Sequence, residues 1–415
     1  MDAVVSVPGS KSVTNRALVL AALADGGTRI RNPLRARDTS LMIGALRVLG
    51  VGVADDGDDW VVNPAALRGG SAIDVGLAGT VQRFVPPLAA LADGPVRFDG
   101  DPRARHRPLA PLVLGLRQLG AEVDDVALPL TVHGTNGLRG GTAEIDAGAS
   151  SQFVSGLLLA APRYAEGLRL RHTGERPVPS SLQVAMTVHM LRDAGATVTA
   201  DPDGREWTVE PGPLRGGDVE VPPDLSSAAP FVVAAVATGG RIRVPGWPRR
   251  SDQPGDRLPE LLRAMGACCT LDDDGLTVTA GDTLLGLDAD LSDCTELVPA
   301  LAALAALAST ESMLHGIAHM RGHETDRLRA LSAELTHLGG ECYETPDGLR
   351  VVPRPLHGGV VSTYDDHRMA MFGAVLGLAV DGILVENVAT TGKTVPDFVE
   401  RWTGMLGTAP AGAPH

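Results

Sequence analysis

Two lysines stand out as candidate catalytic groups because the chain uses arginine almost everywhere else. Of its 36 Lys+Arg residues, only Lys11 and Lys393 are lysine. An ammonium group differs from a guanidinium group in being a compact charge with a tunable pKa. Both lysines lie among small and hydroxyl residues, in Ser10-Lys11-Ser12 and Gly392-Lys393-Thr394. Each is therefore a candidate for chemistry, although a chance survivor on a solvated surface remains the alternative.

The residues around Lys11 predict an anion site at the start of a helix. Pro8 and Gly9 interrupt regular structure, hydroxyl and cationic residues follow, and an apolar run occupies residues 17–23. This order is typical of a loop that feeds a helix. The N-terminus of a helix offers unpaired backbone N–H groups and the positive end of a dipole, so it suits an anion. Lys11 adds a point charge and Arg16 adds a planar fork of donors.

Further clusters combine hydroxyl, amide, acidic and cationic side chains at predicted helix starts or in loops. They occupy residues 76–84, 101–108, 150–153, 173–181, 319–327 and 364–371. Each has a purely structural alternative: Ser150 can be a helix cap, Glu324 and Arg327 an i,i+3 pair, and His367 a surface histidine. The arginines of segment 101–108 alternate as in an exposed strand. Taken together, the clusters predict a site for polyanions between two domains.

The motifs of several common site types are absent from the sequence. It has no Walker A pattern, no GxGxxG after a strand, no HExxH and no GxSxG elbow. Its four cysteines form no CxxC pair, so buried thiols are expected rather than a metal or redox site. We expect no metal and no cofactor.

Length and charge restrict the function classes. A chain of 415 residues predicts two or three domains, and a net charge of −14 argues against nucleic acid and anionic membranes as partners. Apolar runs are interrupted before the roughly 18 residues that a membrane helix needs, and no signal region precedes residue 9. A cytoplasmic location is expected.

One pattern recurs along the chain. A run with helical periodicity ends in glycine, and an extended segment, a turn and a second extended segment follow. The glycines are Gly50, Gly120, Gly195, Gly266 and Gly339. With a degenerate sixth copy at residues 371–388, the chain is expected to hold six α/β units in two groups of three. A Pro- and Gly-rich boundary lies at residues 212–224, and the tail 408–415 is expected to fray.

Seven motifs occur in a fixed order along the chain. They are PGSKSVTNRAL from Pro8, AGT with Arg83, the Arg/Pro segment 102–108, SSQF from Ser150, HETDR from His323, DDHRMAM from Asp365 and GKTVPDF from Gly392. Together they resemble the motifs of the EPSP synthase family of enolpyruvyl transferases. The resemblance spans residues 8–406, almost the whole chain.

The resemblance implies an α/β fold of two similar domains, each with three βαβαββ-type repeats around a pseudo-threefold axis. This agrees with the repeat described above. Domain 1 would comprise residues 1–10 and 224–415, domain 2 would comprise residues 11–223, and the active site would lie in the cleft between them. A monomer is expected.

The resemblance also implies a reaction. The enolpyruvyl group of phosphoenolpyruvate is transferred to the 5-hydroxyl of shikimate 3-phosphate, with release of phosphate, by addition and elimination. This is a step of the shikimate pathway to chorismate and the aromatic amino acids. No cofactor is needed. Inhibition by glyphosate is expected because Gly79 leaves space that a bulkier residue would block.

Residue roles follow from the resemblance, motif by motif. Glu296 would take the proton from the 5-hydroxyl, and Glu324, with Lys11 or Lys393, would protonate the methylene carbon of phosphoenolpyruvate. The expected contacts of shikimate 3-phosphate are Lys11, Ser12, Arg16, Ser150, Ser151, Gln152, Ser180, Glu296 and His323. Those of phosphoenolpyruvate are Lys11, Gly79, Arg103, Gln152, Arg327, Arg368 and Lys393.

Four positions depart from the family pattern and keep other functions open. Leu77 replaces a frequent asparagine, Gln183 a frequent aromatic residue, His323 a frequent lysine and Glu296 a frequent aspartate. A transferase acting on another hydroxyl acceptor in specialised metabolism is one alternative. A UDP-N-acetylglucosamine enolpyruvyl transferase is disfavoured because segment 101–108 lacks the cysteine usual in that family. A non-catalytic anion-binding paralogue is disfavoured by the retained lysines and acids.

Overall fold

The chain divides into two compact units in this computed structural model, which describes residues 1–407. Unit 1 comprises Met1–Pro8 and Pro222–His415, and unit 2 comprises Gly9–Val221. The chain thus leaves unit 1 near its start and returns to it near the Pro- and Gly-rich segment. The division into domains at 10/11 and 223/224, with an active site between them, stays a prediction. The expected fraying of the tail 408–415 lies outside the described residues.

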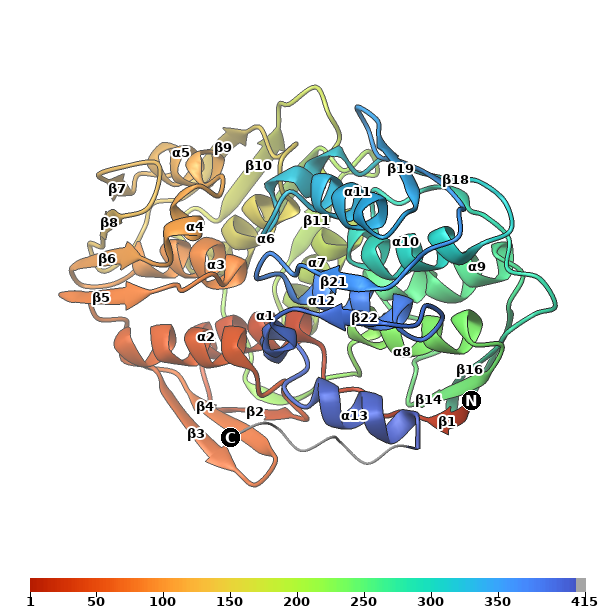
Figure 1. The fold of residues 1–415 in the computed structure, drawn as a ribbon. Helices are drawn as coiled ribbons and strands as arrows, with labels where there is room; N and C mark the ends of the chain where they lie inside the picture. Colours follow the sequence, from red (N-terminus) through yellow and green to blue (C-terminus); the bar gives the residue numbers. More distant parts are fainter. Residues whose placement is uncertain (408–415) are drawn as a thin grey trace. The chain divides into compact units, whose positions relative to one another are not determined.

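Unit 2 is built around three buried helices (Figure 1). Apart from the first two residues of α1 and one residue of α6, every residue of these helices is buried, as expected for helices with apolar residues on all sides. The central helices are α1 (Lys11–Leu23), α3 (Gly79–Ala89) and α6 (Ser151–Ala160). Three outer helices bury one face each: α2 (Arg37–Val48), α5 (Ala110–Gln118) and α7 (Ser181–Asp193). Two short turns are α4 (Pro102–Arg105) and η1 (Ala161–Arg163).

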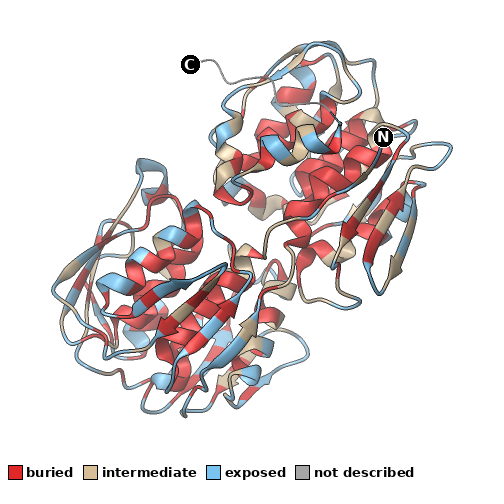
Figure 2. Ribbon diagram, turned by 90° about the horizontal axis from the view of Figure 1, so that it is seen from below, coloured by how far each residue is buried: buried red, intermediate tan, exposed pale blue. Residues whose placement is uncertain are grey.

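Three four-stranded sheets enclose the helices of unit 2, in the orders β13-β2-β4-β3, β5-β6-β8-β7 and β9-β10-β12-β11. Each sheet joins a parallel pair to an antiparallel hairpin. Buried and exposed residues alternate in strands such as β10, so one face covers the helices and the other meets solvent (Figure 2). The strands are β2 (Thr28–Arg31), β3 (Gly52–Asp56), β4 (Asp59–Asn63), β5 (Ser71–Asp74), β6 (Pro95–Asp99), β7 (Glu122–Val123), β8 (Leu130–His133), β9 (Gly141–Ile145), β10 (Leu168–His172), β11 (Val198–Ala200), β12 (Glu206–Val209) and β13 (Gly217–Glu220).

Unit 1 repeats this plan with one shorter sheet. Its sheets have the orders β1-β14-β16-β15, β17-β18-β20-β19 and β21-β22. The central helices are α8 (Leu225–Ala237), α10 (Val298–Leu307) and α12 (His367–Leu376), and the outer helices are α9 (Leu258–Ala264), α11 (Arg327–His337) and α13 (Phe398–Met405). Short 3-10 turns are η2 (Pro254–Arg257), η3 (Thr295–Leu297), η4 (Ala318–Gly322) and η5 (Val388–Lys393). The strands are β1 (Asp2–Val4), β14 (Arg241–Pro245), β15 (Cys268–Asp272), β16 (Gly275–Thr279), β17 (Asp288–Asp290), β18 (Ser312–His315), β19 (Glu341–Glu344), β20 (Leu349–Val352), β21 (Gly359–Val361) and β22 (Ile383–Val385).

The five repeat glycines end the outer helices, as the sequence predicts. Each lies two residues beyond its helix and has a positive φ, between 88° and 99°. This is the left-handed conformation that lets a chain leave a helix, and glycine adopts it at least cost. A hairpin follows every one of them. The expected five copies of helix and hairpin are therefore confirmed.

The sixth copy contains different elements from those that the prediction assigned to it. The apolar run in residues 371–388 belongs to the central helix α12 and to β22, whereas the glycine-terminated runs of the other copies are outer helices. Within residues 1–407 no hairpin follows α13, so this sheet has only two strands. An apolar run cannot by itself distinguish a central helix from an outer one.

The cysteines are thiols, but not all are buried. Cys294 and Cys342 are buried, Cys269 is half-buried and Cys268 is exposed on an edge strand. Burial raises the pKa of Cys269 to about 11, which makes it a poor nucleophile. None of the helices described is long and apolar enough to span a membrane.

Candidate active site

The predicted anion site at Lys11 lies at the first residue of α1, where the sequence places a helix start. The Ser10 hydroxyl caps this helix and accepts a hydrogen bond from the Val13 N–H at 3.5 Å. The second turn of α1 meets the start of α3, since Asn15 Nδ2 donates to Thr80 Oγ1 at 2.9 Å. Lys11 itself lies at the N-terminus of α1, a setting that favours bound anions.

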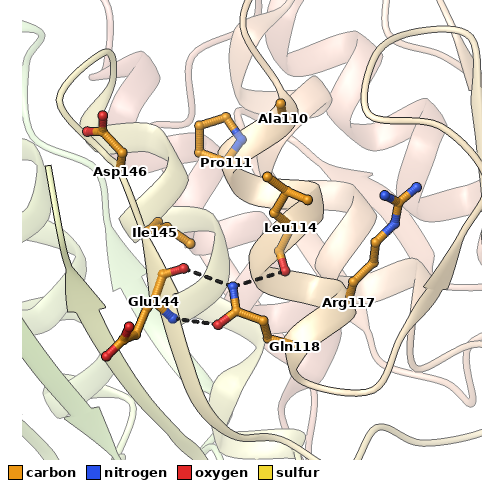
Figure 3. A pocket seen from close by; sticks show the side chains of 8 residues that line it. All are labelled: Ala110, Pro111, Leu114, Arg117, Gln118, Glu144, Ile145 and Asp146. Carbon is orange, nitrogen blue, oxygen red and sulfur yellow. Dashed lines mark hydrogen bonds between the residues drawn. The ribbon is translucent and has the colours of Figure 1, made fainter.

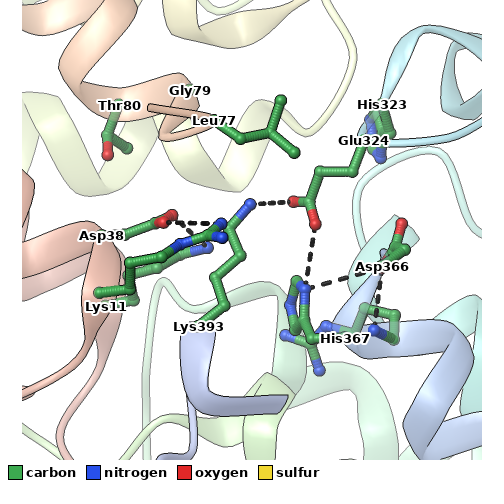
Figure 4. A network of polar contacts seen from close by, with 12 residues as sticks. Lys11, Asp38, Leu77, Gly79, Thr80, His323, Glu324, Asp366, His367 and Lys393 are labelled. Atoms are coloured by element: carbon green, nitrogen blue, oxygen red, sulfur yellow. Dashed lines mark hydrogen bonds and ion pairs between the residues drawn. The ribbon is translucent and has the colours of Figure 1, made fainter. Parts of the chain in front are cut away.

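A buried carboxylate faces Lys11. Lys11 Nζ lies 3.8 Å from Asp38 Oδ2, and Asp38, in the first turn of α2, is only 1% exposed (Figure 4). Sequence reasoning did not select Asp38, because an acid in the first turn of a helix is common and needs no function. Its burial is the feature that sets it apart.

The start of α6 carries the predicted residues Ser150, Ser151 and Gln152. The Ser150 hydroxyl caps the helix and accepts from the Gln152 N–H at 3.2 Å. Gln152 Oε1 accepts from Arg83 Nη1 at 3.1 Å, which joins α6 to α3. Arg83 also donates to the Pro108 carbonyl at 2.9 Å. These contacts hold the segment after α4 against two helix starts.

Two guanidinium groups lie together at Gly79. A Cβ atom at Gly79 would lie 2.8 Å from both terminal nitrogens of Arg107 and 2.9 Å from Arg83 Nη1. Burial and the charge of Arg107 lower the pKa of Arg83 well below its ordinary value. Arg107 also donates to the Leu77 carbonyl at 3.2 Å. Two crowded cations beside a glycine form a cradle that an anion would stabilise.

Arg103 and Arg107 differ in their surroundings. Segment 102–105 forms the short helix α4 and not a strand, although the expected exposure of part of the arginines is confirmed at Arg103 and Arg105. Arg103 is exposed on this helix, whereas Arg107 is half-buried against Gly79. Sequence reasoning missed Arg107 because alternating arginines look alike. The role predicted for Arg103 stays a prediction.

Arg16 and Ser180 are predicted contacts that are largely enclosed by protein. Arg16 is 1% exposed, and its guanidinium packs 5.3 Å from the centre of the Phe84 ring. Ser180 is the N-cap of α7, with φ 51° and ψ 52° and no side-chain capping bond. A non-glycine residue in this left-handed conformation is uncommon and marks a position held by its surroundings. Ser12 follows Lys11 in the first turn of α1.

A second cluster lies in unit 1 and contains Glu324, Lys393 and His367. Lys393 Nζ lies 2.5 Å from Glu324 Oε1, and His367 Nδ1 lies 3.1 Å from Glu324 Oε2 (Figure 4). Burial alone would raise the pKa of Glu324, but the charge of Lys393 and the hydrogen bond with His367 outweigh it and hold the pKa well below its usual range. Burial lowers the pKa of His367 to about 4, despite the attraction of Glu324. His367 is therefore neutral at pH 7, and the alternative of a surface histidine is wrong.

Two buried arginines adjoin this cluster. Asp366 caps α12 and pairs with Arg327 through two hydrogen bonds, of 2.8 and 3.1 Å. Burial would lower the pKa of Arg327, but Asp366 outweighs it and the pKa is raised. Arg368 donates to the Ser226 carbonyl at 2.5 Å, and burial lowers its pKa. His323 Nδ1 lies 3.1 Å from Arg327 Nη1.

Glu296 lies in η3, the turn that leads into the central helix α10, and is half-buried. Its charge raises the pKa of both Arg327 and Arg368. The starts of α10, α11 and α12 thus bring this predicted base near two of the predicted phosphoenolpyruvate contacts.

The donor atoms of Glu324, Asp366 and His367 lie within 4.8 Å of one another, close enough to hold a metal ion. However, Lys393 and Arg327 already neutralise the two carboxylates. A metal cation would have to displace or face these positive charges, so the set suits proton transfer better. The expected absence of a metal stays a prediction.

A pocket of about 540 Å³ between α5 and β9 holds none of the predicted site residues among those that line it (Figure 3). Its floor is fixed by Gln118, whose side-chain amide pairs with the backbone of Glu144 through two hydrogen bonds of 2.8 Å. This amide occupies the edge of strand β9, so we assign the pocket no role in the reaction.

Comparison with known proteins identifies the family. The model of the EPSP synthase (3-phosphoshikimate 1-carboxyvinyltransferase) family matches residues 1–402. The chain belongs to the EPSP synthase family. Two solved structures of EPSP synthase from Acinetobacter baumannii, one at 2.37 Å, are similar to it, with TM-scores of 0.81 and 0.79. Each is 25% identical and covers 97% of this chain, which in turn covers 95% and 96% of those chains.

The resemblance, the fold class and the activity expected from the sequence are thereby confirmed. The enzyme transfers the enolpyruvyl group of phosphoenolpyruvate to shikimate 3-phosphate in the shikimate pathway. Its substrates are two anions, which accounts for local cationic clusters in a chain of net charge −14. The monomeric state and the cytoplasmic location stay predictions.

Proposed function

We propose that the two clusters divide the work of the transferase: the helix starts of unit 2 bind phosphate groups, whereas in unit 1 the Glu324–Lys393 pair moves the proton beside arginines that hold a carboxylate. The buried 2.5 Å contact between Lys393 Nζ and Glu324 Oε1 carries this proposal. A carboxylate and an ammonium at that distance hold one exchangeable proton, and each can act as acid or base.

The reaction requires protons at two places. Glu296 takes the proton of the attacking 5-hydroxyl, whose oxygen forms a bond to C2 of phosphoenolpyruvate. The Glu324–Lys393 pair delivers a proton to C3, which turns the methylene into a methyl group in a tetrahedral intermediate. The C2–O bond to phosphate then breaks, phosphate leaves as HPO4²⁻ with the proton that Glu296 had taken, and the methyl group returns a proton to the pair. Atoms and charges balance without a cofactor.

Cationic side chains hold the phosphate and carboxylate groups during these steps. In unit 2, Arg107 beside Gly79 supports a phosphate contact at the starts of α1 and α3. In unit 1, Arg327 and Arg368 are buried and oriented by protein oxygens, so they are suited to hold the carboxylate of phosphoenolpyruvate. We therefore add Arg107 to the predicted contacts.

A phosphate-release assay tests the acceptor. The enzyme is incubated with phosphoenolpyruvate and one of three acceptors: shikimate 3-phosphate, unphosphorylated shikimate or UDP-N-acetylglucosamine. We expect release with shikimate 3-phosphate and almost none with the others, because the hydroxyl-bearing helix starts of unit 2 are proposed to recognise the 3-phosphate. Equal release with unphosphorylated shikimate would contradict this assignment of the helix starts.

A further inference from the structure

Three helices of unit 2 carry buried polar residues one or two turns below the predicted contacts of shikimate 3-phosphate. Helices α1, α6 and α7 pack against one another. Arg16 lies one turn after Ser12, Ser155 lies one turn after Ser151, and Thr187 lies two turns after the N-cap of α7. Side chains at these spacings share a helix face. Sequence reasoning assigned no role to Ser155 or Thr187.

Arg16 joins the three helices through directed hydrogen bonds. Its Nε donates to Thr187 Oγ1 at 2.7 Å, and its Nη1 donates to the Ser12 carbonyl at 3.0 Å. Its Nη2 donates to the Gln183 carbonyl at 2.9 Å and to Ser155 Oγ at 3.4 Å. One guanidinium group therefore contacts the first turn of α1, the first turn of α7 and the second turn of α6.

The Thr187 hydroxyl is central to this arrangement because it both accepts and donates. It accepts from Arg16, and its own proton lies within reach of Ser155 Oγ at 2.8 Å and the Gln183 carbonyl at 3.0 Å. Thr187 and Ser155 have no exposed surface. A methyl group in place of this hydroxyl would leave a buried guanidinium N–H without its acceptor, which is costly because arginine cannot give up its charge.

We propose that Thr187 and Ser155 are positioning residues for shikimate 3-phosphate. They fix the Arg16 guanidinium, and through it the relative spacing of the helix starts that hold Lys11, Ser12, Ser151 and Ser180. Neither residue touches the reacting atoms. The inference rests on the proposed role of those helix starts in binding the 3-phosphate, and it deepens that role.

The variant Thr187→Val keeps the side-chain shape and removes the acceptor. We expect the Kd of shikimate 3-phosphate to rise about tenfold, because a charged donor must find a new partner and shift the helix starts. The KM of phosphoenolpyruvate and kcat at saturation should change by less than about threefold, since the groups that act on phosphoenolpyruvate are untouched. Thr187→Ser keeps the hydroxyl and should bind nearly as well as the wild type.

Two further variants keep the test decisive. Thr28→Val, in β2, makes the same chemical change at a buried threonine whose hydroxyl has no hydrogen-bond partner among residues 1–407. It should leave the Kd unchanged. Ser155→Ala removes the longer bond to Arg16 Nη2 at a smaller cost to folding, so it should weaken binding less than Thr187→Val while giving a stable protein.

The measurement is calorimetric titration of the full chain with shikimate 3-phosphate, together with thermal melting of each variant. Weaker binding by Thr187→Val, recovery by Thr187→Ser and no change in Thr28→Val would support the proposal. A lowered Tm with wild-type Kd in both Thr187→Val and Ser155→Ala would overturn it, since that is the result of a merely structural role. A wild-type chain that fails to bind shikimate 3-phosphate would overturn the function proposed for the helix starts as well.

Discussion

Lys393 Nζ lies 2.5 Å from Glu324 Oε1, although the two residues are separated by 69 positions in the chain. Both side chains are more than nine-tenths buried, so the pair is shielded from water and salt. The neutral imidazole of His367 contacts the other carboxylate oxygen. This arrangement leaves Glu324 ionised and oriented, with an ammonium proton at hand.

Glu324→Gln tests the proton-transfer role of the pair. The amide keeps the shape but cannot exchange a proton, so we expect kcat to fall about 10²- to 10⁴-fold, the usual contribution of general acid–base catalysis. Steady-state phosphate release measures it. The half-buried Glu341→Gln in β19, outside the cluster of Glu324, Lys393 and His367, serves as control and should retain wild-type kcat. A Glu324→Gln enzyme within threefold of wild type would remove Glu324 from the mechanism.

The lowered pKa of His367 predicts a pH-dependent stability. The unfolded chain binds a proton at this residue near pH 6.5, whereas the folded chain does so near pH 4. Between these values the unfolded state holds more protons, so stability falls as pH drops from about 6.5 to 4. Glu324 also contributes stability that is lost as pH falls, because its pKa is lowered by folding. That loss occurs at lower pH, below the ordinary pKa of a glutamate. Thermal melting at several pH values should show a shallower decline in His367→Asn, and an unchanged slope would contradict this assignment.

Lys11→Arg tests whether the residue at the start of α1 must be an ammonium. Arginine keeps the charge, but its planar fork is larger and does not fit a compact charge 3.8 Å from the buried Asp38. We expect kcat/KM to fall at least about 100-fold with little change in Tm. The reverse exchange at the neighbouring, half-exposed Arg37, Arg37→Lys, is the control and should be tolerated. Near-wild-type activity of Lys11→Arg would reduce the residue to a generic cation.

The structure distinguishes two arginines that the sequence treats alike. Arg107→Met removes a guanidinium from the cradle at Gly79, so the KM of phosphoenolpyruvate should rise by one to two orders of magnitude, the range for a charge-assisted contact, about 1.5–3 kcal/mol. Arg103→Met, on the exposed side of α4, should raise it much less. Initial rates at varied phosphoenolpyruvate measure both. The opposite order of effects would restore Arg103 as the main contact.

Local signals account for what the sequence predicts well. The helix start at Lys11 follows from a hydroxyl cap and an apolar run, and the five helix ends follow from glycines that adopt positive φ. Both signals act between residues a few positions apart. The motifs then supply the order of the units and the family.

The parts of the site that sequence reasoning missed depend on contacts between distant residues. Asp366 is 39 positions from Arg327, and Thr187 is 171 positions from Arg16. In the sequence, nothing distinguishes Thr187 from other polar residues of an outer helix. Only the fold shows that its hydroxyl contacts the buried guanidinium of Arg16. Likewise, Arg107 differs from Arg103 only because a turn after α4 brings it to Gly79. No local pattern encodes such pairings.

Deuterium exchange at C3 of phosphoenolpyruvate tests the central claim most directly. If the Glu324–Lys393 pair protonates C3 and later removes a proton from the resulting methyl group, turnover with shikimate 3-phosphate in D₂O must place deuterium in the vinyl methylene of the product. Proton NMR of the product's methylene signals measures it. We predict partial deuteration of the methylene group with the wild-type enzyme. In Glu324→Gln, the rate of deuterium incorporation should fall together with the rate of turnover. A product formed by the wild type with a fully protonated methylene would contradict the account.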